Sequence, residues 1–345
     1  MTRRSSGGRG PLPALVAPDS SKGTFSANEV AAAIADGLRD AGREVVELPV
    51  ADGGEGTMQV LVTALGGEAR TTTVSDPLGR PIEASFALLP DGSAVVEMAQ
   101  ASGLSLVDEA ERDAWAASTR GTGELIAAAA EAGAAPIVVT VGGSATTDGG
   151  VGALDALREA EFAPRGESAR ATGRRESGAL ELRVVCDVRV PFEDAPRVFG
   201  PQKGADARMV KRLGRRLDEL AASFPRDPRG VPMTGAAGGL SGGLWAALGA
   251  KLVPGAAYVL DAIGFDARMR NSAFVVTGEG ALDEQTLQGK IVGEVATRCR
   301  QGGVACHAIV GRNRLDPFGE RIIDLASVTE ATTLDELRSA GEALV

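Results

Sequence analysis

Histidine and cysteine are scarce in this sequence, and their scarcity restricts the chemistry that the protein can perform. The 345 residues include one histidine, His307, and three cysteines, Cys186, Cys299 and Cys306. Ser-His-Asp triads, Cys-His proteolysis and multi-histidine metal sites must therefore use His307 or be absent. An odd number of cysteines without CxxC spacing predicts no disulfide framework and matches no zinc pattern. We expect the protein to be cytoplasmic, because the cytosol keeps thiols reduced.

Aromatic residues, positive charge and long apolar runs are also lacking. Aromatic residues make up 3% of the chain, which argues against stacking platforms for nucleic-acid bases. The 46 acidic residues outnumber the 36 basic ones, so the formal charge is −10. A basic surface that neutralises the phosphates of a nucleic acid is therefore not expected. No run approaches the roughly 20 apolar residues of a membrane span. We therefore expect no nucleic-acid and no membrane partner, and we expect residues 1–13 to form a disordered extension.

Alternating apolar patterns at both ends of the chain predict a parallel sheet. Apolar runs at residues 14–17 and 45–50 are typical of buried strands. The segment 26–41 between them predicts a helix, because Ser26 can cap it and apolar residues follow at every fourth position. A strand, a helix and a further strand form the unit from which parallel sheets are built. The same alternation returns from residue 273 onwards.

The middle of the chain predicts a second domain of different construction. Residues 82–89 and 94–98 are strand-like and are joined by the turn Pro90-Asp91-Gly92, which indicates a hairpin. A purely parallel domain would not contain such a hairpin. We therefore predict an α/β fold in which a discontinuous Rossmann- or flavodoxin-like parallel-sheet domain, residues 14–70 and 273–345, carries an inserted mixed α/β domain, residues 71–272.

Glycine is abundant, with 46 residues, and six glycine-rich segments also contain acidic, hydroxyl or lysine side chains. Glycine lets backbone N–H groups converge on an anion, carboxylates hold Mg²⁺ or accept a proton, and lysine supplies positive charge. These are the requirements of phosphoryl transfer. The chain has neither a GxxxxGK[ST] loop nor a GxGxxG fingerprint, so a standard nucleotide loop and a nicotinamide dehydrogenase are not favoured. The segments span residues 18–23, 51–57, 142–150, 200–204, 235–243 and 277–283.

Ten sequence segments occur along the chain in an order that is specific in combination. They are APDSSKGTFSANEV (17–30), ELPVADGGEGT (47–57), DPLGRPIEASFALLPDG (76–92), VEMAQASGL (96–104), STRGTGELI (118–126), VGGSATTDGG (141–150), CDV (186–188), VFGPQKGA (198–205), GAAGGLSGGL (235–244) and TGEGALDEQTLQGK (277–290). Together they closely resemble bacterial glycerate kinases of the first type, over residues 14–311. The resemblance implies phosphorylation of D-glycerate by ATP with Mg²⁺, with 2-phosphoglycerate as the favoured product. It also implies two dissimilar α/β domains, one of them discontinuous.

The same resemblance implies chemical roles for five residues. Lys22 and Lys290 would supply charge to phosphate or carboxylate groups. Asp52, Asp187 and Asp283 are candidates for Mg²⁺ binding or for the base that takes the hydroxyl proton of glycerate, with Asp187 and Asp283 as the metal candidates. The choice among the three carboxylates stays open.

Binding roles are implied for further residues of these segments. The carboxylate of glycerate needs a cation or a cluster of N–H groups, and Arg80 is one candidate. The glycine-rich turns would offer backbone N–H groups to the nucleotide phosphates. Glycerate binding is therefore implied for Asp19, Ser20, Arg80, Glu279 and Thr286, and nucleotide binding for Gly142, Gly143, Ser144, Ala145, Thr146, Gly238 and Gly239.

The chain departs from the family pattern at several positions. Ser21 stands where an aromatic residue is usual, Arg120 where Tyr is usual, Thr147 and Val190 where Asn is usual, and Ala281 where Arg is usual. These changes keep two alternatives open: a diverged, slow or non-catalytic relative that binds nucleotide or a hydroxy acid, and a kinase for another small hydroxy acid. The oligomeric state is open as well, a homodimer being one option.

Overall fold

The structure is a computed structural model that describes residues 12–21, 23–162, 180–284, 286 and 290–345. The chain divides into two compact units. The first unit contains residues 1–51 and 259–345, and the second unit contains residues 52–258. The sequence places the divisions later, after residues 70 and 272, because it assigns the helix that ends near Leu65 to the first sheet. Residues 1–11 of the expected extension lie outside the described residues.

The first unit is built on a five-stranded parallel sheet. Its strands lie in the order β11-β10-β9-β1-β2. Counted along the unit, this order is 2-1-3-4-5, which is the flavodoxin-like arrangement. The predicted fold class is confirmed for this sheet. The strands are β1 (Ala14–Pro18), β2 (Val45–Glu47), β9 (Phe274–Gly278), β10 (Ala305–Val310) and β11 (Ser327–Glu330).

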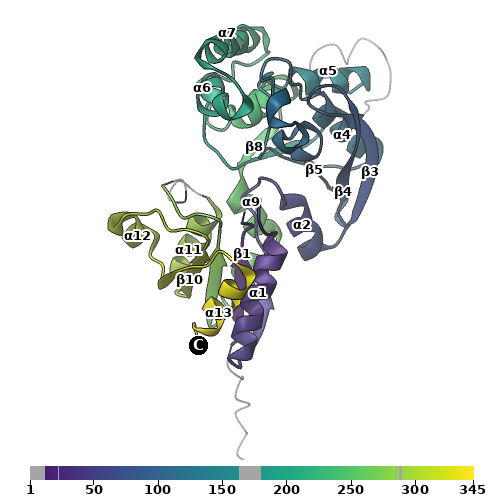
Figure 1. Ribbon diagram of the computed structural model, residues 1–345. Helices are drawn as coiled ribbons and strands as arrows, with labels where there is room; N and C mark the ends of the chain where they lie inside the picture. The colour runs from purple at the N-terminus through teal and green to yellow at the C-terminus, as the bar shows by residue number, and fades with distance from the viewer. Residues whose placement is uncertain (1–11, 22, 163–179, 285, 287–289) are drawn as a thin grey trace, which may run out of the picture. The chain divides into compact units, whose positions relative to one another are not determined.

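Helices cover the first sheet. Helix α1 (Ala27–Asp40) begins with a capping box, in which the Ser26 hydroxyl accepts the Glu29 amide and the Glu29 carboxylate accepts the Ser26 amide. Helices α1 and α13 (Leu334–Glu342) lie side by side in Figure 1, and both bury apolar side chains against the same strands. Helix α11 packs against β9 and β10. The further helices of this part are α10 (Phe265–Met269), α11 (Ile291–Gly302) and α12 (Pro317–Ile323), and α9 (Gly255–Ala262) contains the division between the units.

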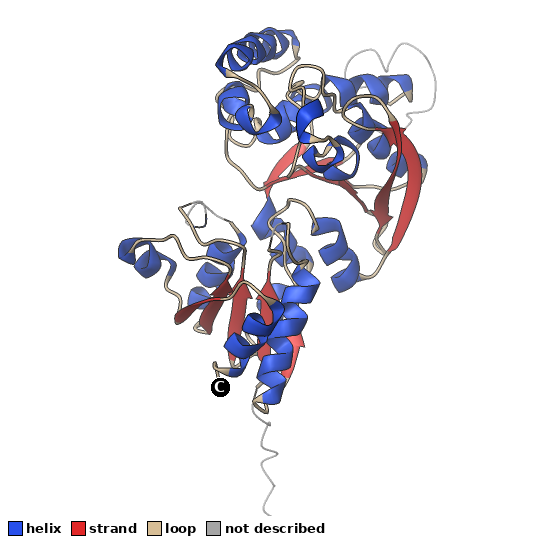
Figure 2. Ribbon diagram, in the orientation of Figure 1, coloured by secondary structure: helices blue, strands red, loops and turns tan. Residues whose placement is uncertain are grey.

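The second unit is built on a six-stranded mixed sheet in the order β3-β4-β5-β6-β7-β8, and its strands are red in Figure 2. Strands β3, β4 and β5 pair antiparallel, and β5 to β8 pair parallel. The predicted hairpin is confirmed as β4 and β5, whose register pairs Leu88 with Ala94. The strands are β3 (Glu68–Ser75), β4 (Pro81–Leu88), β5 (Ala94–Glu97), β6 (Ile137–Thr140), β7 (Leu182–Cys186) and β8 (Lys251–Pro254).

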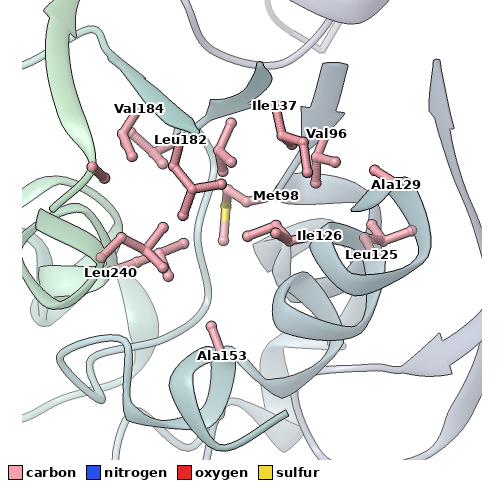
Figure 3. Close-up of a cluster of buried hydrophobic side chains, with 14 of the residues drawn as sticks. Val96, Met98, Leu125, Ile126, Ala129, Ile137, Ala153, Leu182, Val184 and Leu240 are labelled. Atoms are coloured by element: carbon pink, nitrogen blue, oxygen red, sulfur yellow. The ribbon is translucent and has the colours of Figure 1, made fainter. Parts of the chain in front are cut away.

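A large apolar core fixes the helices of the second unit on this sheet. Figure 3 shows sheet residues such as Val96 and Ile137 facing Leu125 and Ile126 of α4, with Met98 between them. Every one of these five side chains is 1% exposed or less. The helices are α2 (Thr57–Leu65), α3 (Ala99–Ser102), α4 (Arg120–Glu131), α5 (Val151–Glu159), α6 (Ala195–Phe199), α7 (Ala207–Ser223) and α8 (Leu240–Leu248).

Candidate active site

The first unit gathers predicted site residues at the topological switch point of its sheet. Strands β1 and β9 are neighbours, and ligands of flavodoxin-like sheets bind beyond the carboxyl ends of such strands. Asp19 directly follows β1, and its backbone amide donates to the carbonyl oxygen of Gly278, the last residue of β9, at 2.8 Å. Its carboxylate accepts the amide of Ser20 at 2.6 Å and is buried. Asp19 and Ser20 therefore lie at the switch point, next to the start of the glycine-rich segment 277–283.

The segment after β9 brings four more predicted residues together. The hydroxyl of Thr286 donates to a carboxylate oxygen of Glu279 at 2.7 Å and accepts the amide of Asp283 at 3.1 Å. The ammonium nitrogen of Lys290 lies 3.7 Å from a carboxylate oxygen of Asp283. We call Asp19, Ser20, Glu279, Asp283, Thr286 and Lys290 the switch-point cluster. Lys22, which the sequence assigns to the same site, lies outside the described residues.

The second unit gathers its predicted residues at the carboxyl edge of the parallel strands β5 to β8. The register pairs Glu97 with Thr140 and Cys186 with Pro254, so the four strands end at one edge. The loops that follow β6 and β7 therefore leave the sheet side by side, the first with Gly142 and the second with Asp187. Parallel strands commonly present their ligand-binding loops at this edge.

The turn at residues 52–56 packs against this edge. A Cβ added at Gly142 would lie 2.5 Å from the Cα of Gly54, and one at Gly143 would clash with the Glu55 side chain. The carboxylate of Asp52 accepts the amide of Gly54 at 2.9 Å, which closes the turn. Glycine is required at residue 142 because only a residue without a Cβ allows the backbone of the turn to approach so closely, and it is favoured at residue 143 by a φ of +70°.

Glu97, at the end of β5, is a buried acid that the sequence analysis does not single out. Its carboxylate accepts the amides of Gly56 at 3.0 Å and Met58 at 3.2 Å, at the start of α2. Burial raises the pKa of Glu97, these hydrogen bonds oppose the rise, and the charge of Glu55 adds to it. The only available signal is an acid that ends an apolar strand. Its contacts make Glu97 the support of the 52–56 turn.

A pocket of about 100 Å³ opens at the same edge, and we call it the edge pocket. Gly142, Gly143 and Ser144 line it together with Asp187 and Ala237. Among the described residues, no acceptor pairs with the amide N–H groups of residues 142–144. Three N–H donors and one carboxylate in a single pocket form a set that can bind phosphate oxygens together with a cation.

Lys203 holds the loop at residues 142–147 from its inner side. It is 1% exposed, and its ammonium donates to the Ser144 hydroxyl at 2.7 Å and to the Thr146 carbonyl oxygen at 2.5 Å. Burial lowers the pKa of Lys203 to about 7, and the charge of Asp148 acts in the opposite direction. Residues 200–204 form one of the glycine-rich segments, but the sequence predicts no role for Lys203. The burial of a single lysine depends on distant parts of the chain and cannot be recognised from the neighbouring residues.

The other predicted nucleotide residues support the loop instead of lining the edge pocket. Ala145 and Thr146 are buried residues of the loop itself. Gly238, at a φ of +64°, packs so closely that a Cβ would clash with the Thr146 carbonyl oxygen, and its own carbonyl oxygen accepts the Gly149 amide. Gly239 is packed against Phe192. These residues fix the shape of the loop.

Arg80 belongs neither to the switch-point cluster nor to the lining of the edge pocket. Its guanidinium donates to the carboxylate of Asp76 at 2.6 Å and to that of Glu111 at 3.0 Å. The structure also describes the surroundings of two departures from the family pattern. Arg120 pairs with the carboxylates of Glu124 and Glu159. The hydroxyl of Thr147 is buried and has no hydrogen-bond partner among the described residues.

The described residues contain no group of three or more His, Cys, Asp and Glu side chains that is placed to hold a metal ion. A nucleotide-bound Mg²⁺ usually takes one or two protein carboxylates and completes its shell with phosphates and water. Asp187 in the edge pocket fits that donor chemistry. No helix in the described part of the chain is long and apolar enough to span a bilayer.

Comparisons with known proteins agree with one another. A model described as the glycerate kinase family matches residues 14–340. The Glycerate 2-kinase of Escherichia coli is 40% identical, covering 80% of this chain and 79% of the relative. The Glycerate kinase of Halalkalibacterium halodurans is 38% identical, and the match covers 96% of this chain and 94% of the relative. A crystal structure described as glycerate kinase 2 from Salmonella typhimurium LT2 has a TM-score of 0.78 at 34% identity and covers 97% of both chains.

Proposed function

Because the chain belongs to the glycerate kinase family, we propose that it transfers the γ-phosphoryl group of ATP to D-glycerate and yields 2-phosphoglycerate. The family match extends over nearly the whole chain, and the chain covers 79% and 94% of the relatives from Escherichia coli and Halalkalibacterium halodurans. The name of the relative from Escherichia coli, Glycerate 2-kinase, supports the 2-hydroxyl as the acceptor.

The edge pocket is the observation that carries the nucleotide half of the proposal. The amides of Gly142, Gly143 and Ser144 would donate to phosphate oxygens, because they line the pocket and have no acceptor among the described residues. The supporting residues Ala145, Thr146, Gly238 and Gly239 would hold this loop in shape. Preorganised donors of this kind cost little reorganisation when charge develops on the transferred group.

Asp187 would hold the Mg²⁺ that accompanies ATP. It is the carboxylate that lines the edge pocket beside the three amides. When bound, the ion would neutralise charge on the β- and γ-phosphates. Asp283 is the second metal candidate, and its carboxylate lies beside the ammonium of Lys290.

The switch-point cluster would bind the acceptor. Asp19, Ser20, Glu279 and Thr286 offer hydrogen-bonding groups for the two hydroxyls of glycerate, and Lys290, with Lys22, would attract its carboxylate or a phosphate. Arg80 is a weaker candidate for the carboxylate, because Asp76 and Glu111 already accept hydrogen bonds from its guanidinium. Asp52, Asp187 and Asp283 are the candidates for the base that takes the hydroxyl proton of glycerate.

We place the enzyme in the cytoplasm. All three cysteines are buried free thiols, which suits a reducing compartment.

The decisive experiment incubates the purified protein with ATP, Mg²⁺ and D-glycerate in a coupled ADP assay, and then locates the phosphate on the product by ³¹P and ¹H NMR. We expect turnover and a 2-phosphoglycerate spectrum. A 3-phosphoglycerate spectrum would correct the regiochemistry alone. A folded sample without turnover, across several Mg²⁺ concentrations, would favour a non-catalytic relative. Comparing kcat/KM over a panel of short hydroxy acids completes the test. A strong preference for another acid would overturn the identification of D-glycerate as the acceptor.

A further inference from the structure

Among the described residues, Lys203 is the one buried lysine or arginine, and the proposed chemistry does not use it. It ends a short helical turn at residues 201–203, and Gly204 follows at a φ of +88°. Burying an ammonium group is costly unless the surrounding groups compensate for the lost water. A lysine retained in such a place therefore needs an explanation in terms of what it contacts.

Its contacts concentrate on the loop that lines the edge pocket. The ammonium donates to the hydroxyl of Ser144 and to the carbonyl oxygen of Thr146, two residues that follow the amides of Gly142 and Gly143. Ser144 lines the edge pocket, whereas Lys203, together with Ala145, lines a separate small cavity. Lys203 itself is not among the described residues that line the edge pocket.

The charged groups around the amine are few. Asp148 is buried, and its carboxylate accepts hydrogen bonds from the amides of Thr119, Gly150 and Gly152 while its charge favours the ammonium form of Lys203. Arg112 and Asp113 line the same small cavity as Lys203. Burial outweighs Asp148 and brings the pKa of Lys203 to about 7, so the amine changes its charge near neutral pH.

We propose that Lys203 is a positioning residue: from behind the loop it fixes Ser144 and Thr146, and so holds the amides of residues 142–144 in the arrangement that binds the nucleotide phosphates. It acts through the loop, because its ammonium donates to two loop oxygens and Lys203 does not itself line the edge pocket. This role rests on the proposed function in that the edge pocket is taken to bind ATP.

The test compares the wild type with Lys203→Met, which keeps the length of the side chain and removes the donor. We expect KM for ATP and the Kd of ADP, measured by calorimetry, to rise by about tenfold or more, since hydrogen bonds from charged donors are the stronger ones. KM for D-glycerate should change by less than about twofold. Lys211→Met, at an exposed lysine of α7, is the matched control and should leave all three values unchanged.

The pH profile separates positioning by the charged amine from simple packing. The ratio of the variant's KM for ATP to that of the wild type should be largest at pH 6 and should shrink towards pH 9, because the wild type loses its ammonium charge in that range. A ratio that does not change with pH would overturn the role of the charge.

A second variant covers the case in which Lys203→Met does not fold. Ser144→Ala removes one of the two acceptors and should weaken ADP binding in the same direction by a smaller factor. Unchanged ADP affinity in both variants, or in Ser144→Ala when Lys203→Met is unfolded, would overturn the proposal. Failure of the wild type to phosphorylate glycerate while it binds ADP would instead overturn the proposed function, and the binding comparison would still decide the role of Lys203.

Discussion

At the scale of single residues, Asp187 is the carboxylate whose charge would act directly on a ligand in the edge pocket. It lines the edge pocket beside the amides of residues 142–144 and directly follows the buried strand β7. The sequence points to it through the resemblance to glycerate kinases, because Asp187 matches the aspartate of the family's CDV segment. The structure adds that the carboxylate shares a pocket with the loop.

Asp187→Asn should lower kcat by at least about a hundredfold, because a positioned carboxylate contributes on that scale whether it holds a cation or moves a proton. The melting temperature and circular dichroism should match those of the wild type, as should those of the exposed control Asp218→Asn. A near-normal kcat in the folded variant would exclude both roles.

Lys290→Ala should raise KM for one charged substrate and leave kcat less affected. The ammonium is near Asp283 and about one-fifth exposed, so it can still attract an anion. Steady-state kinetics with ATP and glycerate varied separately tell which anion it serves. Two unchanged KM values would remove the charge role, and partial recovery in Lys290→Arg would support it.

Lys203 should also make the stability of the protein depend on pH. Its pKa is about 7 in the folded protein and near 10.5 in the unfolded chain, so between these values only the unfolded chain binds the proton. The free energy of unfolding therefore rises with pH across this window, by about 1.4 kcal/mol per unit of pKa difference at most, and shows no such gain below pH 7.

Urea unfolding of the wild type and of Lys203→Met at pH 6.5, 8 and 9.5 measures this contribution, because the difference between the two proteins cancels the other titrating groups. The difference should move in favour of the wild type as pH rises. A constant difference would show that the amine titrates alike in the folded and unfolded states.

Residue identity alone predicts only part of the site. Asp19, Glu279, Asp283 and Thr286 could be singled out from their segments, and the structure does bring them to one switch point. Lys203 could not be given a role, and Glu97 could not be singled out, because what marks them is burial, which depends on elements far away in the chain. Their roles, like those of the predicted residues, stay predictions until they are tested.

At the scale of elements, the two helical glycines Gly37 and Gly214 offer opposite environments. Gly37 of α1 faces α13 so closely that a Cβ would clash with the carbonyl oxygen of Arg338. Gly214 of α7 has open space around the same position. The close approach of α1 and α13 therefore depends on the missing side chain at residue 37.

Gly37→Ala should lower the free energy of unfolding by about 1–3 kcal/mol, the usual cost of overpacking. Gly214→Ala should raise it by up to about 1 kcal/mol, because alanine favours the helix without a clash. Denaturant unfolding of both variants checks the pair. Equal effects of the same sign would mean that the α1–α13 contact is looser than described.

Elements with a clear apolar period were predictable, and polar edge elements were not. Helix α1 follows from its capping residue and its four-residue repeat, and β7 from its apolar run. Strand β3 has one buried residue, Val74, and forms because it pairs with β4 along eight residues. Pairing of that kind is a tertiary effect, which a local pattern does not contain.

At the scale of the whole molecule, each unit carries its own predicted ligand group, and this division can be tested directly. Hydrogen exchange with a non-hydrolysable ATP analogue should protect the amides of residues 142–144 of the second unit, because bound phosphates would accept hydrogen bonds from them. D-Glycerate alone should protect residues near Glu279 and Thr286 of the first unit. Protection by the nucleotide that appears only in the first unit would reverse the assignment.

The large-scale plan of two α/β units was predictable because β-α alternation stops and then resumes. The division points were harder to place, since α2 has the same amphipathic character as a helix of the first sheet but packs against β4 and β5. Which sheet a helix covers is decided by long-range packing, and periodicity specifies only that it covers one.

The position of β9 next to β1 has a consequence for synthesis on the ribosome. Strand β1 is an interior strand of its sheet, yet one of its two neighbours, β9, is made only after the whole second unit, because β1 ends at Pro18 and β9 begins at Phe274. At about 5–20 residues per second the nascent β1 waits roughly 13–50 s for that neighbour. During this interval one side of an apolar strand is unpaired, so we expect the emerging N-terminal segment to be a target for chaperones, and the inserted unit to complete its folding first.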